Sequence, residues 1–208
     1  MKSTNPEELR SKVQAVPFWW HSIQLGEGIT TPGEKSSEVL EKELQSLHLP
    51  NLSGKTVLDI GAWDSFYSFE AERKGAKSVS ALDHYVWSMD LPAMIAYWNE
   101  CKRKGVVPKQ YDEVPGMWQP ADLPGKRDFD LARETLGSKV NPIVADFTST
   151  DLKALGEFDV TLYLGVLYHM HDPFRCLKRL ARHSGACHRR DIGNSRPRIR
   201  EVSVVGVL

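Results

Sequence analysis

Two carboxylates and a glycine mark the ends of the first two apolar strands that the sequence predicts. Asp59 lies near the end of the run 56–60, Gly61 follows that run directly, and Asp83 follows the run 79–82. Because the carboxyl ends of parallel strands form the ligand-binding edge of an open α/β sheet, these residues are placed to bind a nucleoside. Asp83 comes about twenty residues after the glycine turn, a spacing that suits hydrogen bonds to ribose hydroxyl groups.

The glycine pattern discriminates between adenosine-containing cofactors. A nicotinamide dinucleotide requires G-x-G-x-x-G, so that backbone N–H groups can reach its pyrophosphate. After Gly61 the chain has Trp63 and Ser65, and no second glycine where that pattern needs one. Asp59 suits instead the cationic amino-acid end of S-adenosylmethionine. A side chain at 63 or 65 narrows the cofactor pocket, although Trp63 could equally form a wall beside the methionine end.

A third predicted strand, 142–144, is followed by Asp146 and Phe147. These residues would place a carboxylate near the adenine amino group and an aromatic ring beside the base. Phe147 is equally expected in the core, since aromatic side chains bury large areas. His84 is predicted to be a surface residue or to lie at the adenine edge, rather than to act in catalysis.

The resemblance to a known family becomes specific over residues 158–173, F-D-V-T-L-Y-L-G-V-L-Y-H-M-H-D-P. This run is similar to the fourth-strand region of class I S-adenosylmethionine-dependent methyltransferases, and it resembles the group that modifies the wobble uridine of tRNA in the 5-oxyacetate pathway. W-W-H-S-I at 19–23, with L-G at 25–26 and T-P-G at 31–33, resembles the same group's lead-in segment.

The resemblance extends over residues 17–182. It implies an α/β fold, a Rossmann-like methyltransferase three-layer sandwich, with Gly165 among the cofactor contacts. It also implies S-adenosylmethionine or a carboxylated form of it as the methyl donor, and tRNA as the acceptor. A carboxylated cofactor would need a dedicated positive contact, and the sequence assigns no arginine to that role.

Tyr168 and His169 follow the fourth predicted strand, where the transferred methyl group would point. Transfer to a hydroxyl group needs an acceptor aligned with the sulfonium and a base that accepts its proton. His169, with an ordinary pKa near ~6.5, suits that role, and Tyr168 could orient the acceptor. The alternative is that His169 only caps backbone groups. His169 and His171 lack a third ligand at useful spacing, so no metal is predicted.

An aromatic group at Trp19, Trp20 and His21 precedes the first predicted strand. It either forms a hydrophobic lid on the core or closes over the cofactor and stacks on a base, which aromatic rings do without needing charge. Trp20 and His21 are the candidate substrate contacts. Lys35 is expected to be a solvated lysine rather than a cation that contacts cofactor or substrate.

Composition is that of an ordinary globular protein: 208 residues with 41% hydrophobic content predict one α/β domain with a substantial core. The 27 basic and 27 acidic residues give zero net charge. Nucleic-acid binders usually carry a basic surface, so a tRNA acceptor would require a local basic patch. A small-molecule O- or N-methyltransferase is the alternative, with the Pro- and Gly-containing insertion 107–124 as a substrate lid.

The sequence predicts a cytoplasmic protein that has no membrane partner. It has no apolar run of about eighteen residues, and its first residues lack the apolar core of a signal peptide. Cys101, Cys176 and Cys187 lack paired spacing, which favours reduced thiols over disulfides or a zinc site.

Three regions are expected along the chain: an N-terminal helical and aromatic lead-in over 1–50, an S-adenosylmethionine-binding Rossmann-like core over 51–182, and an irregular tail over 183–208. Periodicity predicts further elements. The helices are expected over 6–16, 34–47, 66–75, 92–104, 129–136 and 173–182, and a fourth strand over 160–164.

The tail shows no strand period where the family has its next strand, so the last strands of the sheet are predicted to be missing. A frameshift or early end explains the abrupt change, and a natural arginine-rich tail explains the basic residues. Residues 202–208 could add one edge strand. An inactive remnant that binds the cofactor is therefore a third functional hypothesis.

Overall fold

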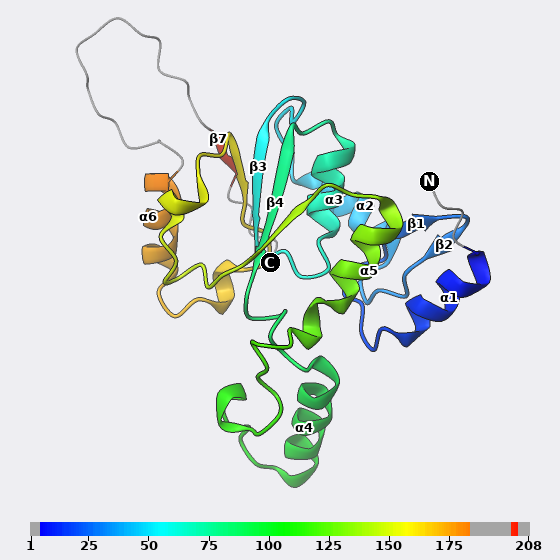
Figure 1. Ribbon diagram of the computed structural model, residues 1–208. Helices are drawn as coiled ribbons and strands as arrows, with labels where there is room; N and C mark the ends of the chain where they lie inside the picture. Colours follow the sequence, from blue (N-terminus) through cyan, green and yellow to red (C-terminus); the bar gives the residue numbers. More distant parts are fainter. Residues whose placement is uncertain (1–4, 184–200, 204–208) are drawn as a thin grey trace, which may run out of the picture. The chain divides into compact units, whose positions relative to one another are not determined.

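The computed structural model describes residues 5–183 and 201–203 (Figure 1). The chain forms two compact units. The first, called the sheet unit, comprises Ser46–Ala62, Tyr67–Asp83 and Lys139–Leu208. The second, called the aromatic unit, comprises Met1–Gln45, Trp63–Phe66 and His84–Ser138.

The sheet unit is built on five parallel strands in the order β5-β4-β3-β6-β7. Their bounds are β3 Thr56–Ile60, β4 Ser78–Asp83, β5 Asn141–Val144, β6 Val160–Leu162 and β7 Glu201–Ser203. The four predicted strands are confirmed; a fifth strand, β7, pairs with β6 at the start of the range 202–208 predicted for an extra strand, and residues 204–208 lie outside the described residues. The predicted irregular tail over 183–208 lies mostly outside the described residues, and the division into lead-in, core and tail stays a prediction.

Successive side chains of β3 point to opposite faces of the sheet. Both of these faces are covered by helices. Asp59 bonds to Ser68 on α3 (Phe66–Arg73), so α3 covers one face. Leu58 and Ile60 point the other way and share a core with residues of α6 (Pro173–His183). Figure 1 shows the strands between these two helices. This arrangement confirms the predicted α/β three-layer fold.

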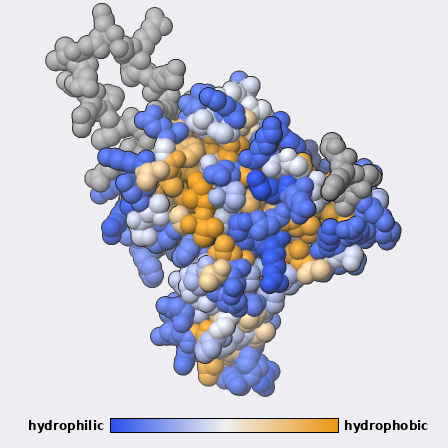
Figure 2. Space-filling view, viewed as in Figure 1, coloured by the Kyte–Doolittle hydropathy of each residue, from blue (hydrophilic) through white to orange (hydrophobic). Residues whose placement is uncertain are grey.

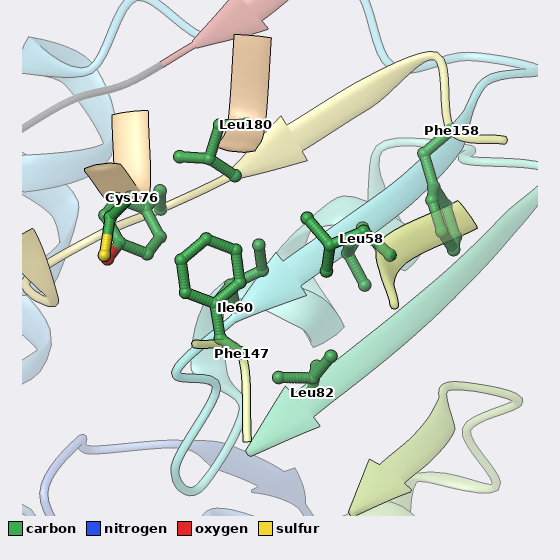
Figure 3. Close-up of a cluster of buried hydrophobic side chains, with 9 residues drawn as sticks. Leu58, Ile60, Leu82, Phe147, Phe158, Cys176 and Leu180 are labelled. Carbon is green, nitrogen blue, oxygen red and sulfur yellow. The ribbon is translucent and has the colours of Figure 1, made fainter. Parts of the chain in front are cut away.

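The core on the α6 side is continuous (Figure 3). Burial of each leucine, isoleucine or phenylalanine side chain contributes about 1.5–3 kcal/mol to the stability of the fold. This cluster therefore stabilises the packing of α6 on the strands, close to the carboxyl ends of those strands. Its buried members are Leu58, Ile60, Leu82, Phe147, Leu152, Phe158, Tyr163, Cys176 and Leu180.

The aromatic unit carries four α-helices and a hairpin among its described residues. Their bounds are α1 Pro6–Ala15, β1 Gln24–Gly26, β2 Ile29–Thr30, α2 Ser37–Ser46, α4 Leu91–Lys104 and α5 Arg127–Leu136. Local signals set several ends. The Asn5 side chain accepts from the Glu7 backbone N–H at the start of α1, and Gly105, with φ of 66°, ends α4.

Two features of this unit differ from the sequence-based expectation. The β1–β2 hairpin was not predicted, because strands of three and two residues are too short to establish a period. In the helix predicted over 34–47, apolar spacing places Val39 and Leu40 on one face, yet Val39 is 44% exposed, whereas Leu40 is 1% exposed. The apolar face of α2 is therefore narrower than its sequence indicates.

The segment 107–124 is irregular, as predicted, apart from the short 3-10 helices η1 (Tyr111–Glu113) and η2 (Pro124–Lys126). None of the helices in residues 5–183 is both long and apolar enough to cross a membrane. Cys101 and Cys176 are buried free thiols, and Cys187 lies outside the described residues.

Candidate cofactor and acceptor site

The predicted cofactor carboxylates lie where β3 and β4 end, at what is called here the carboxyl edge of the sheet. Asp59 is 3% exposed and its Oδ2 accepts a 2.7 Å hydrogen bond from the Ser68 hydroxyl. Asp83, 4% exposed, is the last residue of β4. Since the two strands run parallel and in register, both carboxylates belong to the edge at which open α/β sheets bind ligands.

Gly61 begins the turn after β3 and has φ of 75°. Its N–H donates to the Leu82 carbonyl at 2.8 Å. A Cβ at this position would lie 2.4 Å from Val166 Cγ2, in the loop that follows β6. Gly165, in that same loop, has φ of 69°. Only glycine permits this close approach between position 61 and Val166. Gly61 and Gly165, the two glycines predicted to contact the cofactor, therefore both lie at the carboxyl edge.

Asp146 and Phe147 also follow a strand of this edge. The Asp146 carboxylate accepts 2.8 Å hydrogen bonds from the Thr148 N–H and the Ser149 hydroxyl, so it caps a turn. Phe147 is 6% exposed and packs on Tyr163 with ring centroids 5.3 Å apart. Of the two roles weighed for Phe147, core packing is observed, and the adenine contacts of both residues stay predictions.

Tyr168 and His169 lie on η4 (Leu167–His169), after β6. Both side chains are exposed, and their ring centroids are 4.3 Å apart. The backbone N–H of His169 donates to the backbone carbonyl of Val166 at 3.0 Å. Although the residue is exposed overall, burial of part of its imidazole lowers the pKa of His169 from the ordinary value of 6.5, which favours the neutral form that can accept a proton.

Within the aromatic unit, the lead-in segment stacks on the turn that carries Trp63. The Trp20 and Trp63 rings are nearly parallel, at 8°, with centroids 5.0 Å apart, and Phe18 stacks on Trp63 at 6.0 Å. Trp19 is 2% exposed and its indole N–H donates to the Val13 carbonyl. Trp19 is therefore core, while Trp20 is half-buried.

His21, a predicted substrate contact, is buried against Asp64. Its Nδ1 lies 2.5 Å from Asp64 Oδ1, and Asp64 Oδ2 accepts from the backbone N–H groups of Trp20 and His21 at 3.1 and 2.7 Å. Asp64 is wholly buried. Sequence reasoning missed this residue, although an acid placed between Trp63 and Ser65 in a turn was a signal worth weighing.

The turn 61–65 repeats one backbone conformation at alternate residues. Gly61, Trp63 and Ser65 have φ of 75°, 50° and 64°. The left-handed region costs a residue other than glycine about 1–2 kcal/mol. The backbone therefore adopts three glycine-type conformations, although the sequence supplies glycine only at the first.

Replacing Ser65 with glycine is expected to raise the free energy of unfolding by about 1 kcal/mol, because it relieves the left-handed strain. The Ser65 hydroxyl is also buried and has no hydrogen-bond partner in the described part of the chain. Urea denaturation of Ser65→Gly measures this. Ser68→Gly is the matched control and should lose stability, since it weakens α3 and removes the bond to Asp59. If the Ser65→Gly chain were no more stable than wild type, the positive φ of Ser65 would not be a source of strain.

The remaining candidates lie in the aromatic unit. His84 is half-buried, and its ring meets the edge of Trp118 at 5.2 Å. Lys35, expected to be solvated, instead donates to both carboxylate oxygens of Glu43 at 2.8 and 2.9 Å. Within residues 5–183 and 201–203, no group of three or more histidine, cysteine and acidic side chains is arranged to hold a metal ion.

The parallel sheet, its two helical layers and the carboxylates at its carboxyl edge define a Rossmann-like α/β fold. No protein-family model and no curated protein matches the chain. Among solved structures, the N-terminal domain of EvdMO1, determined in the presence of SAH and D-fucose, matches with a TM-score of 0.56 and 19% identity. The match covers 86% of this chain and 61% of that one.

Two further EvdMO1 structures agree with this match, both at 19% identity over 86% of this chain. The N-terminal domain with SAH bound has a TM-score of 0.55, with 62% of its chain covered. The EvdMO1 chain in its crystal structure has a TM-score of 0.54, with 33% covered. The present chain thus spans less than two thirds of each of these chains, and the likeness is one of fold.

Proposed function

We propose that this chain is an enzyme that binds S-adenosylmethionine and transfers its methyl group to an acceptor. The observation that carries the proposal is the pair of buried carboxylates, Asp59 and Asp83, beside the left-handed turn at Gly61. The EvdMO1 domain of similar fold binds SAH, the product that remains when S-adenosylmethionine has lost its methyl group. This likeness supports the same cofactor here.

The donor set suits the charges of that cofactor. Asp59 would face the ammonium group, Asp83 would accept hydrogen bonds from the ribose hydroxyls, and the backbone at Gly61 and Gly165 would allow close approach. The sulfonium of the bound cofactor supplies the electrophilic methyl group. The further cofactor contacts that this proposal assigns within the sheet unit are Asp146 and Phe147, while the cofactor contacts of Trp63 and His84, in the aromatic unit, stay predictions from the sequence.

Bound S-adenosylmethionine would supply an electrophilic methyl group, whose S–C bond would break, with the electron pair left on sulfur, as an acceptor oxygen bonds to that methyl group. Tyr168 would orient a hydroxyl acceptor in line with the sulfonium, and His169 would take the hydroxyl proton. No covalent enzyme intermediate is required.

Two acceptor classes are proposed. The motifs over residues 158–173 and the lead-in resemble the tRNA wobble-uridine group, which supports tRNA. The zero net charge supports a small hydroxylated molecule, and so does the EvdMO1 domain structure determined with D-fucose present. Transfer of tritiated methyl from S-adenosylmethionine to undermodified tRNA or to a panel of sugars separates these classes. Cofactor binding without transfer to any acceptor would identify an inactive remnant and contradict the enzyme.

Replacing His169 with glutamine is expected to lower kcat by about 10²-fold or more, because the proton acceptor is lost. In wild type the rate should fall as the pH drops through the pKa of His169, which is below 6.5, since the protonated ring accepts no proton. That acidic limb should vanish in His169→Gln. A pH series of initial rates measures both effects, with exposed His171→Gln as control. An unchanged limb would show that His169 is no base.

A further inference from the structure

A pocket of about 400 Å³ on the sheet unit is lined by the first turns of α6. Its lining residues are Asp172, Phe174, Arg175, Lys178 and Arg179. Figure 2 shows mainly hydrophilic residues along the edge of the molecule that carries this helix. The pocket thus concentrates positive charge in a chain whose net charge is zero.

The cations share one side of the helix, since positions 175, 178 and 179 have the spacing that places side chains together. Neither Arg175 nor Lys178 forms an ion pair with an acidic side chain of the described residues. The single carboxylate, Asp172, already caps the helix, because its Oδ1 accepts from the Arg175 N–H at 2.8 Å. Positive charge therefore dominates the lining.

Arg179 is held in place before any ligand arrives. Its Nη2 donates to the Thr150 carbonyl, and its guanidinium lies 5.7 Å from the centre of the Phe147 ring. Its Nε is buried and has no hydrogen-bond partner among the residues that the structure describes. A buried donor without a partner is stabilised by an acceptor that reaches it, and more strongly when the donor is charged. An anionic oxygen is the best such acceptor.

We propose that this pocket binds a phosphate group of the acceptor substrate. Two guanidinium groups and an ammonium match the oxygens of a phosphate, and Phe174, 75% exposed, offers a ring to an adjoining base or sugar. Since η4 packs against α6, the pocket adjoins the element that carries Tyr168 and His169. A phosphate held here would anchor the acceptor beside the proton-accepting side chain. The inference rests on the proposed methyltransferase function.

The test measures binding of two phosphate sources by the full chain: inorganic phosphate, and a fluorescent single-stranded oligouridylate. In the variant Arg175→Gln/Lys178→Gln, both probes should bind about tenfold more weakly or worse. The control, Lys55→Gln/Lys77→Gln, removes two exposed lysines of the sheet unit that precede β3 and β4, and it should bind like wild type. These substitutions are on the surface, so folding is preserved, and unfolding curves confirm that.

The outcomes separate the two proposals. Competition between inorganic phosphate and the oligonucleotide indicates that the phosphate group alone is recognised, whereas preference for the oligonucleotide indicates a polynucleotide acceptor. Either result supports the phosphate-binding pocket, provided that Arg175→Gln/Lys178→Gln loses the binding. Equal binding of both probes by variant and control would overturn the pocket, and retained S-adenosylmethionine binding in that case would leave the methyltransferase proposal intact. Phosphate binding without cofactor binding would reject the methyltransferase and keep the anion site.

Discussion

The Asp64→Ala chain is expected to lose about 3–5 kcal/mol of its free energy of unfolding. Asp64 is wholly buried and accepts from the backbone N–H groups of Trp20 and His21 and from the His21 ring. Alanine would leave all of these donors without their acceptor in a buried environment, where each unpaired group is destabilising. Urea denaturation of the full chain measures the loss. Tryptophan fluorescence should also change, because the Trp20–Trp63 stack depends on this anchor.

Two further variants give this prediction its controls. Asp64→Asn keeps an acceptor oxygen and should lose less than Asp64→Ala. Asp112→Ala removes an exposed carboxylate of the same unit and should be within about 0.5 kcal/mol of wild type. If Asp64→Ala were as stable as Asp112→Ala, the carboxylate would not hold the lead-in segment.

The Gly33→Ala chain is expected to lose about 3 kcal/mol or more, or to fail to fold. A Cβ at Gly33 would lie 2.1 Å from the His21 carbonyl carbon and 2.3 Å from the Ser22 nitrogen. These are backbone atoms that cannot swing aside. Their segment is fixed by the bond from Ser22 N–H to the Lys35 carbonyl at 3.0 Å. Thermal and urea unfolding of the purified chain test the effect.

Gly28→Ala is the matched control for this substitution. Gly28 has φ of 69°, but apart from Gly28 and its two chain neighbours, no heavy atom of the described residues lies within 4 Å of the position that an alanine Cβ would take. Alanine there is therefore unfavourable only through its backbone conformation, by about 1 kcal/mol. Gly33 should be far more sensitive than Gly28. Equal losses at the two positions would rule out the close backbone contact as the cause.

The strands of the sheet unit were predictable because their burial leaves a strong apolar signal. β3 and β4 are almost continuously buried and stand out as apolar runs. Asp59 and Asp83 followed from the rule that parallel strands present their carboxyl ends at one edge. The β1–β2 hairpin gave no comparable signal, since its residues Gly26, Glu27 and Gly28 turn the chain through positive φ after only three strand residues.

Contacts between residues that lie far apart in the sequence could not be predicted from local sequence patterns. Asp64 lies 43 residues from His21, and no local spacing predicts their contact. The turn at Trp63 and Ser65 is instructive in another way, because both residues depart from a glycine-rich pattern while their backbones keep positive φ. Motif matching recognises side chains, whereas this turn is defined by its dihedral angles.

Calorimetric titration of the purified chain with S-adenosylmethionine tests directly whether the carboxyl edge of the sheet binds this cofactor. We expect a Kd on the order of micromolar for the wild-type chain, binding weakened about 10- to 100-fold in Asp83→Asn, and unchanged binding in the surface control Asp112→Asn. A folded chain that releases no heat of binding with S-adenosylmethionine, or one that binds equally well after Asp83→Asn, would contradict a cofactor site at the carboxyl edge of this sheet.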